Sequence, residues 1–135
     1  MTDPSHFQQL LEAARQQPDP QRLLFVFAAA ELPDDATAAQ RQRFTAGQGG
    51  TLAPLMCVDK APTDLPDFAA LHRESQDAGP PWQVVFAAGL GGHNGQPPTA
   101  AQIDVALEAM VEAVRTGSFG RFAAYDKNGN QLEFQ

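Results

Sequence analysis

Residues 22–29 of the chain read Arg-Leu-Leu-Phe-Val-Phe-Ala-Ala. After the arginine every side chain is apolar, and aromatic and branched residues dominate the first part of the run. Such an uninterrupted run is typical of a strand that is covered on both faces. We therefore expect this segment to be the central strand of a sheet, with the remaining elements arranged around it.

Helical and strand patterns alternate on both sides of this run. Apolar residues recur at helical spacing in several segments, which predicts helices over residues 5–17, 36–46, 64–78 and 99–116. Further apolar runs predict strands over residues 51–58 and 82–88. The chain ends with two short segments, 121–126 and 131–134, that flank an Asn-Gly pair, and this pair predicts a β-hairpin.

The predicted order of elements is thus αβαβαβαββ. Helices that alternate with apolar strands are typical of a sheet covered by helices on both faces, in which each helix crosses over to a parallel strand. We expect a three-layer α/β sandwich with a mixed, mostly parallel five-stranded sheet, whose antiparallel edge is the C-terminal β-hairpin. A length of 135 residues is typical of one domain, so residues 1–135 are predicted to form a single α/β domain.

Charge and composition exclude several classes of protein. The chain has 9 lysines and arginines against 16 aspartates and glutamates, and the basic residues are scattered, whereas binding to nucleic acid or anionic lipid needs clustered positive charge. The longest apolar runs, at residues 23–30 and 84–90, are much shorter than the ~20 residues of a membrane span, and no secretory leader pattern is present. The single cysteine allows no disulfide framework, so we expect a cytoplasmic protein.

Ligands of open α/β sheets bind beyond the carboxyl ends of the strands. In this chain the residues at such positions are Asp59, Lys60, Gly91, Gly92 and His93. The glycine-rich loop over residues 89–95 leads to a capped helix, where backbone amides and the helix dipole can hold an anion. These residues are therefore the candidates for a ligand site. We favour instead a plain connecting loop for residues 89–95 and, for the Asp-Lys pair, an ion pair or a helix cap, and we keep the ligand site as the alternative.

Neither a nucleotide motif nor a catalytic constellation accompanies this loop. The glycine spacing matches neither a dinucleotide fingerprint nor a phosphate-binding P-loop. The histidines, His6, His72 and His93, have no metal-ligand spacing, and Cys57 is expected to be a buried, unreactive side chain of its strand. We therefore assign no catalytic residue, no metal and no cofactor.

The segments that carry a family resemblance are Arg22-Leu-Leu-Phe-Val-Phe-Ala with Glu31-Leu32-Pro33-Asp34-Asp35-Ala36, and Gly49-Gly50 with Pro54-Leu55-Met56-Cys57-Val58-Asp59-Lys60. Over nearly its full length the chain resembles a group of small bacterial proteins described as ribonucleotide reductase alpha subunit or subunit-like. A catalytic reductase subunit uses one cysteine for a thiyl radical and a further pair to deliver electrons, inside a barrel larger than this chain, whereas Cys57 stands alone. The resemblance therefore implies association with a reductase rather than catalysis. In the order helix, strand, strand, helix the chain also resembles the N-terminal domain of enhanced-serine-sensitivity proteins.

Three hypotheses on function follow. The first is a cytosolic, non-catalytic interaction or regulatory protein with a protein partner, because a complete fold signature is present without a chemical constellation. The alternative is a small-molecule or nucleotide-binding protein that uses the loop from Gly89 to Gly95. The third is a homodimer in which the exposed edges of two C-terminal hairpins pair into a continuous sheet.

Overall fold

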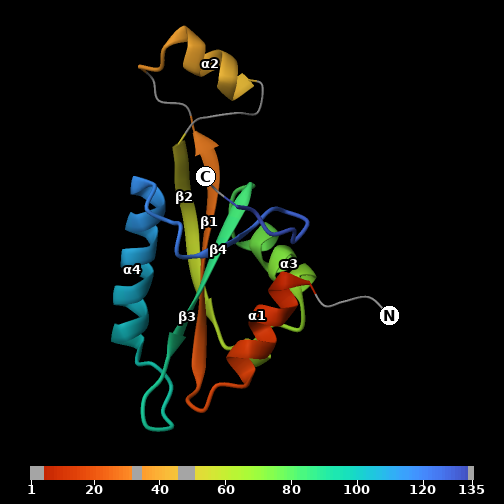
Figure 1. Ribbon diagram of the computed structural model, residues 1–135, viewed down its shortest axis with the longest axis vertical. Coiled ribbons are helices and arrows are strands. Elements are labelled where there is room, and N and C mark those ends of the chain that lie inside the picture. Colours follow the sequence, from red (N-terminus) through yellow and green to blue (C-terminus); the bar gives the residue numbers. More distant parts are fainter. Residues whose placement is uncertain (1–4, 32–34, 46–50, 134–135) are drawn as a thin grey trace.

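The computed structural model describes residues 5–31, 35–45 and 51–133 (Figure 1). Its helices are α1 (His6–Arg15), α2 (Ala38–Thr45), α3 (Phe68–Ala78) and α4 (Ala100–Thr116), and a short 3₁₀ turn, η1, covers Pro62–Asp64. Its strands are β1 (Gln21–Glu31), β2 (Thr51–Lys60), β3 (Val84–Gly91) and β4 (Ala123–Tyr125). The main helices and strands therefore follow the predicted order as far as β4.

The sheet has four strands in the order β2-β1-β3-β4, and every neighbouring pair is antiparallel. The predicted mixed, mostly parallel five-stranded sheet is therefore wrong. The error begins at the connection between β1 and β2, where the prediction has α2 crossing over a face of the sheet. Instead Glu31 and Thr51 are partners in the β1–β2 ladder, so the chain returns where it left, and α2 lies beyond the end of the hairpin (Figure 1).

β2 and β3 do run in the same direction, but β1 lies between them and is antiparallel to both. Leu23 of β1 faces Lys60 on one side and Gly89 on the other. The parallel pair that the sequence pattern predicts is thus split by a third strand. Because β1 has a neighbour along both edges, the predicted central position of residues 22–29 is confirmed.

The predicted C-terminal hairpin forms its turn, but its second strand is reduced to a single bridge. The carboxylate of Asp126 accepts a hydrogen bond from the amide of Asn130 at 3.0 Å, and this bond is the main cause of the lowered pKa of Asp126. The returning segment contributes one bridge, from Gln131 to Tyr125. Phe134, in the last predicted strand, lies outside the described residues. The described part of the sheet therefore has no fifth strand.

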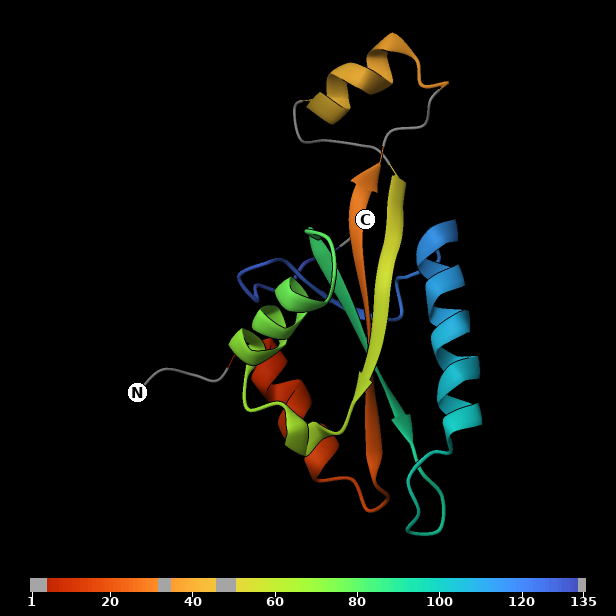
Figure 2. The same cartoon turned by 180° about the vertical axis from the view of Figure 1, so that it is seen from behind.

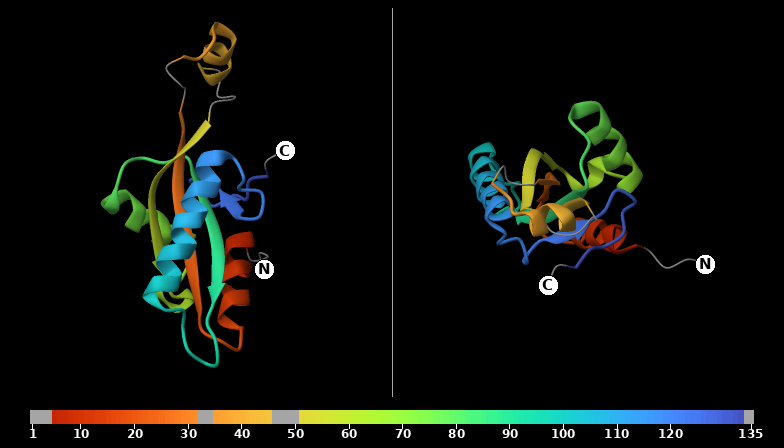
Figure 3. Two further views of the ribbon diagram at one scale, coloured as in Figure 1. Left: turned by 90° about the vertical axis from the view of Figure 1, so that its left-hand side faces the viewer. Right: turned by 90° about the horizontal axis from the view of Figure 1, so that it is seen from above.

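Helices cover both faces of the sheet (Figures 2 and 3). α1 and α3 lie on one face, where Phe25 and Phe27 of β1 pack with Phe7. α4 lies on the other face, where Leu24 and Val26 pack. Successive side chains of a strand point to opposite faces. The continuous apolar run of β1 therefore places apolar side chains on both faces of the sheet, where they pack in two separate cores.

α4 begins and ends where the sequence predicts. The side chain of Thr99 accepts a hydrogen bond from the amide of Gln102 at 3.1 Å, and the side chain of Gln102 accepts one from the amide of Thr99 at 2.9 Å. This reciprocal pair is a capping box. Gly117 ends the helix in the left-handed region, with φ 84°, where glycine pays no steric penalty. Local chemistry thus sets both ends of this helix.

Tyr125 ends β4 and is fully buried, with its hydroxyl oxygen 2.7 Å from Nδ1 of His6 on α1. Burial raises the pKa of this phenol from 10.0 to about 12, because the ionised form would lose its hydration. As the pH rises, the phenol of Tyr125 therefore ionises in the unfolded chain at a lower pH than in the folded protein. The contribution of Tyr125 to the free energy of unfolding should be constant well below pH 10 and should fall by about 2–3 kcal/mol as the pH rises from 10 to 12.

A spectrophotometric titration tests this prediction directly, because Tyr125 is the only tyrosine in the chain. Phenolate absorbance of the native protein is expected to rise with a midpoint near pH 12. The control is the same titration in denaturant, where the midpoint should be about 10, the value of a hydrated tyrosine. A native midpoint equal to that of the unfolded chain would contradict the prediction.

Candidate functional site

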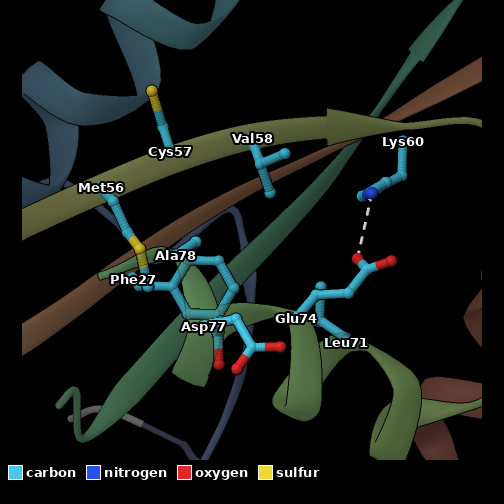
Figure 4. Close-up of a pocket in the computed structure, with 10 residues that line it drawn as sticks. Phe27, Met56, Cys57, Val58, Lys60, Leu71, Glu74, Asp77 and Ala78 are labelled. Atoms are coloured by element: carbon cyan, nitrogen blue, oxygen red, sulfur yellow. Dashed lines mark ion pairs between the residues drawn. The ribbon is translucent and has the colours of Figure 1, made fainter. Parts of the chain in front are cut away.

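A groove of about 560 Å³ separates β2, the outer strand of the sheet, from α3 (Figure 4). β1 contributes the floor, β2 one wall and α3 the other. The apolar side chains of this α3 groove are Phe27, Met56, Val58, Leu71 and Ala78. Its volume lies within the range typical of ligand pockets, roughly 300–1,000 Å³. The α3 groove is therefore large enough to receive apolar side chains of a binding partner.

The side chains of β2 alternate between the two faces of the sheet (Figure 4). Met56 and Val58 point toward α3, whereas Cys57 points to the opposite side, toward α4. The prediction that Cys57 is buried is wrong, since its side chain is exposed. The physical reason is that β2 has a neighbouring strand on one side only.

A second groove lies on the other side of β2, against α4. It has a volume of about 350 Å³, and its lining residues are Cys57, Asp104, Leu107, Glu108 and Val111. The residues from α4 are three or four positions apart, so they share one helix face. We call this the α4 groove. β2 thus runs between α3 and α4 (Figures 2 and 3). A groove lies on each side of it, one against each helix.

Two ion pairs mark the end of β2. Nζ of Lys60 lies 3.0 Å from a carboxylate oxygen of Glu74 on α3, and Nε of Arg22 donates to the carboxylate of Asp59 at 2.8 Å. The predicted site residues Asp59 and Lys60 therefore each pair with another element rather than with one another. Partly exposed pairs of this kind contribute up to about 1 kcal/mol each. They tie the end of β2 to β1 and α3.

A buried hydrogen-bond chain fixes α3 against the sheet. Nε1 of Trp82 donates to Oγ of Ser75 at 2.7 Å, and the Ser75 hydroxyl donates to the backbone carbonyl of His72 at 2.6 Å. The Trp82 ring also packs edge-on against Phe27, with the ring centroids 5.1 Å apart. These contacts set the position of the α3 wall relative to the floor of the groove.

The outer backbone edge of β2 pairs with no other strand in the described part of the chain. Natural sheets commonly protect such an edge with proline, bulges or charged side chains. β2 has the first two near its start, since Pro54 has no N–H to donate and Leu55 is an extra residue that makes a bulge in the ladder with β1. The segment from Met56 to Lys60 has neither a proline nor a bulge, and its two charged side chains, Asp59 and Lys60, are each held in an ion pair with another element. This segment is therefore the open part of the edge.

Backbone amides of the glycine-rich loop over residues 89–95 donate hydrogen bonds to other groups of the protein. The amide of His93 donates to the carbonyl of Gln96 at 2.9 Å, and the amide of Gly95 donates to the carboxylate of Asp19 at 2.8 Å. The loop is thus a closed turn, and the Asp19 carboxylate already occupies a position that an anionic ligand would need. These bonds weaken the case for an anion site here.

The five predicted ligand residues do not form one cluster. Asp59 and Lys60 end β2, whereas Gly91, Gly92 and His93 lie at the end of β3 or just beyond it. β1 lies between these strands, so the two sets are at the same end of the sheet but on opposite sides of β1.

Sequence reasoning missed the groove residues because Met56 and Val58 have the pattern of a strand buried on both faces. One signal in the sequence could have found them. A proline is confined to strand starts, bulges and outer edges, since it cannot donate to a ladder, and Pro54 therefore already indicates an outer position for this strand.

Comparison of the chain with protein-family models, with characterised proteins and with solved structures finds no match. Within residues 5–31, 35–45 and 51–133, no group of three or more histidine, cysteine, aspartate or glutamate side chains is placed to hold a metal ion. No helix in this part of the chain is both long enough and apolar enough to cross a bilayer. The candidate site therefore rests on the geometry of β2 and its two flanking helices.

Proposed function

We propose that the protein is a non-catalytic interaction domain that binds an extended segment of a protein partner along the outer edge of β2. In this mode the segment adds a strand to the sheet. Its backbone bonds to the free groups of β2, and its side chains enter the adjoining grooves. One observation carries the proposal: the open edge from Met56 to Lys60 has a groove on each side.

Exposed apolar side chains on β2 support the proposal. Leu55 is 37% exposed and Cys57 is exposed, although both lie on a strand. In the open part of the edge, residues 56–58 carry no charged side chain, and Asp59 and Lys60 are held in ion pairs. An outer strand with an uncharged stretch of this kind is prone to pair with another chain. An added strand would cover these side chains and satisfy the free backbone groups.

Three of the polar side chains beside the α3 groove, Lys60, Glu74 and Ser75, are already bonded within the fold, which supports a non-catalytic role. The hydroxyl of Ser75 both donates to a backbone carbonyl and accepts from Trp82, and Lys60 is paired with Glu74. The alternative, a small-molecule or nucleotide site in residues 89–95, has less support because amides of that turn are bonded within the protein. We also propose a cytoplasmic location, since the single cysteine permits no disulfide within the chain.

Backbone methylation of a bound peptide tests for an added strand. Peptides selected from a random library for binding to the whole chain are expected to shift the amide signals of Met56 to Lys60 in NMR spectra. In an added strand, every second amide faces β2. Methylating that set should weaken binding roughly tenfold, and methylating the other set should leave the affinity unchanged. Equal effects of the two sets, or shifts confined to residues 89–95, would contradict the proposal.

Two matched lysine variants locate the binding surface. Cys57→Lys places a charge on the outer strand, which is how natural sheets block pairing, and should weaken the same peptides roughly tenfold. Val105→Lys adds the same charge at a 67% exposed residue of α4 that lines neither groove, and should leave binding unchanged. Equal losses would remove the β2 edge as the site. Ribonucleotide reductase subunits, with which the family resemblance implies association, are the first natural partner for this comparison.

A further inference from the structure

Carboxylates flank the open edge of β2 on both helices. Asp104 and Glu108 lie on the face of α4 that lines its groove, and Asp77 of α3 lines the other groove. No ion pair forms to any of these carboxylates within the described residues, whereas Glu74 is paired with Lys60. The surroundings of the edge therefore carry negative charge that the protein itself does not neutralise.

The two grooves differ in chemistry. In the α3 groove, apolar side chains form the floor and part of each wall, Lys60 is neutralised by Glu74, and Asp77 is the one lining carboxylate with no ion pair among the described residues. In the α4 groove, Asp104 and Glu108 stand beside apolar residues of the same helix face. A strand added to β2 presents alternate side chains to the two grooves, because successive side chains point to opposite faces. One set of its side chains would meet the apolar floor of the larger groove, with one unpaired carboxylate at its wall, and the other set would meet the two unpaired carboxylates of α4.

We propose that the partner segment is an extended strand in which apolar residues alternate with lysine or arginine. The apolar side chains enter the α3 groove, and the cationic ones face Asp104 and Glu108. This inference rests on the proposed function, since it assumes strand addition at β2. The net charge of -7 adds a general attraction for cations. Individual exposed pairs are weak, but complementary charge selects the partner and speeds its association.

Three synthetic peptides of equal length test the inference: valine alternating with lysine, with glutamine or with glutamate. The valine-lysine peptide is expected to shift the amide signals of Met56 to Lys60 and of the α4 face from Asp104 to Val111. At low ionic strength it should bind roughly tenfold more tightly than the valine-glutamine peptide. At about 1 M salt this advantage should disappear, because exposed charges are then screened. The valine-glutamate peptide should bind most weakly.

Two double variants distinguish the effect of the α4 carboxylates on peptide binding from the effect of the overall net charge. Asp104→Asn with Glu108→Gln should abolish the tenfold advantage of the lysine peptide. Glu31→Gln with Glu133→Gln changes the net charge equally at exposed positions that line neither groove, and should preserve that advantage. Equal losses in both double variants would overturn the inference, since overall charge alone would then explain the preference.

The outcomes distinguish failure of the inference from failure of the proposed function. If the lysine and glutamine peptides bind β2 equally well, the charge preference is overturned and strand addition stands. If none of the three peptides shifts the β2 amides, strand addition fails together with the inference. If the lysine peptide shifts only signals away from β2, the acidic surface binds cations without the strand edge, and the inference is again overturned.

Discussion

Replacing Trp82 by alanine is expected to lower the free energy of unfolding by about 3–5 kcal/mol. The indole is 3% exposed, and its ring contacts Phe27 and Phe68 at centroid distances of 5.1 and 6.5 Å. Alanine would leave a cavity between α3 and the sheet and would remove the N–H that donates to Ser75. Because Trp82 is the only tryptophan, unfolding in denaturant is best followed by far-ultraviolet circular dichroism rather than by fluorescence.

Two milder variants separate the ring from its hydrogen bond. Trp82→Phe keeps an aromatic ring but loses the donor, and Ser75→Ala loses the acceptor, so each is expected to cost about 1–3 kcal/mol. The double variant should cost less than the two single losses together, because both remove the same bond. If Trp82→Ala cost no more than these variants, the ring would not be what holds α3 in place.

Gly92→Ala is expected to destabilise the protein by about 3 kcal/mol, at the upper end of the usual cost of overpacking. A Cβ at this position would lie 1.9 Å from the carbonyl oxygen of Gln96 and 2.9 Å from that of Pro20. The amide of Gly92 also donates to the Pro20 carbonyl at 2.9 Å. These are backbone atoms on both sides of a closed turn, so they cannot give way without breaking it. Urea unfolding measures the effect.

Gly91→Ala is the matched control, one residue earlier. The nearest atom to its Cβ would be Nε2 of Gln21, at 3.1 Å, which is the far end of a flexible side chain. Its free energy of unfolding should stay within about 0.5 kcal/mol of the parent. Similar losses for the two variants would contradict the packing argument. If Gly92→Ala alone lost a function, the broken turn would be sufficient to explain the loss, and a ligand site in this loop would not have to be assumed.

Features set by near neighbours could be predicted from the sequence. The capping box at Thr99 and the glycine at residue 117 fix α4, and the apolar run at residues 22–29 fixes the two-sided burial of β1. The direction of β2 depends instead on whether α2 crosses the sheet. The sequence of α2, Ala-Ala-Gln-Arg-Gln-Arg-Phe-Thr, offers little apolar face with which to cover a sheet. That weakness is the one local sign against a crossover.

The outer position of β2 was harder to predict because of its bulge. Leu52 packs in the core on the α4 side, whereas Met56 and Val58 pack on the α3 side, although all three have even numbers. The extra residue, Leu55, shifts the alternation by one. Residues 51–58 therefore look like a strand buried on both faces.

The five candidate ligand residues are divided into two groups for a reason of topology. The rule that ligands gather at the carboxyl ends of strands belongs to parallel sheets, in which those ends share one edge. In this antiparallel sheet, the two strands that run in the same direction, β2 and β3, are separated by β1. Asp59 and Lys60 consequently lie on one side of β1, and Gly91, Gly92 and His93 lie on the other side, in a separate turn.

If a partner adds a strand to β2 as proposed, the bulge at Leu55 also limits how long that partner stays bound. Pro54 has no N–H and the bulge breaks the spacing of the ladder, so an added strand keeps step with β2 only from Met56 to Lys60, about 16 Å. So short a strand forms few backbone bonds, each contributing about 0.5–1.5 kcal/mol. Few bonds give a low affinity, and low affinity is mostly expressed as fast dissociation, so we expect such a complex to dissociate quickly. Under the proposed strand addition, this edge would therefore make brief contacts with a short partner sequence.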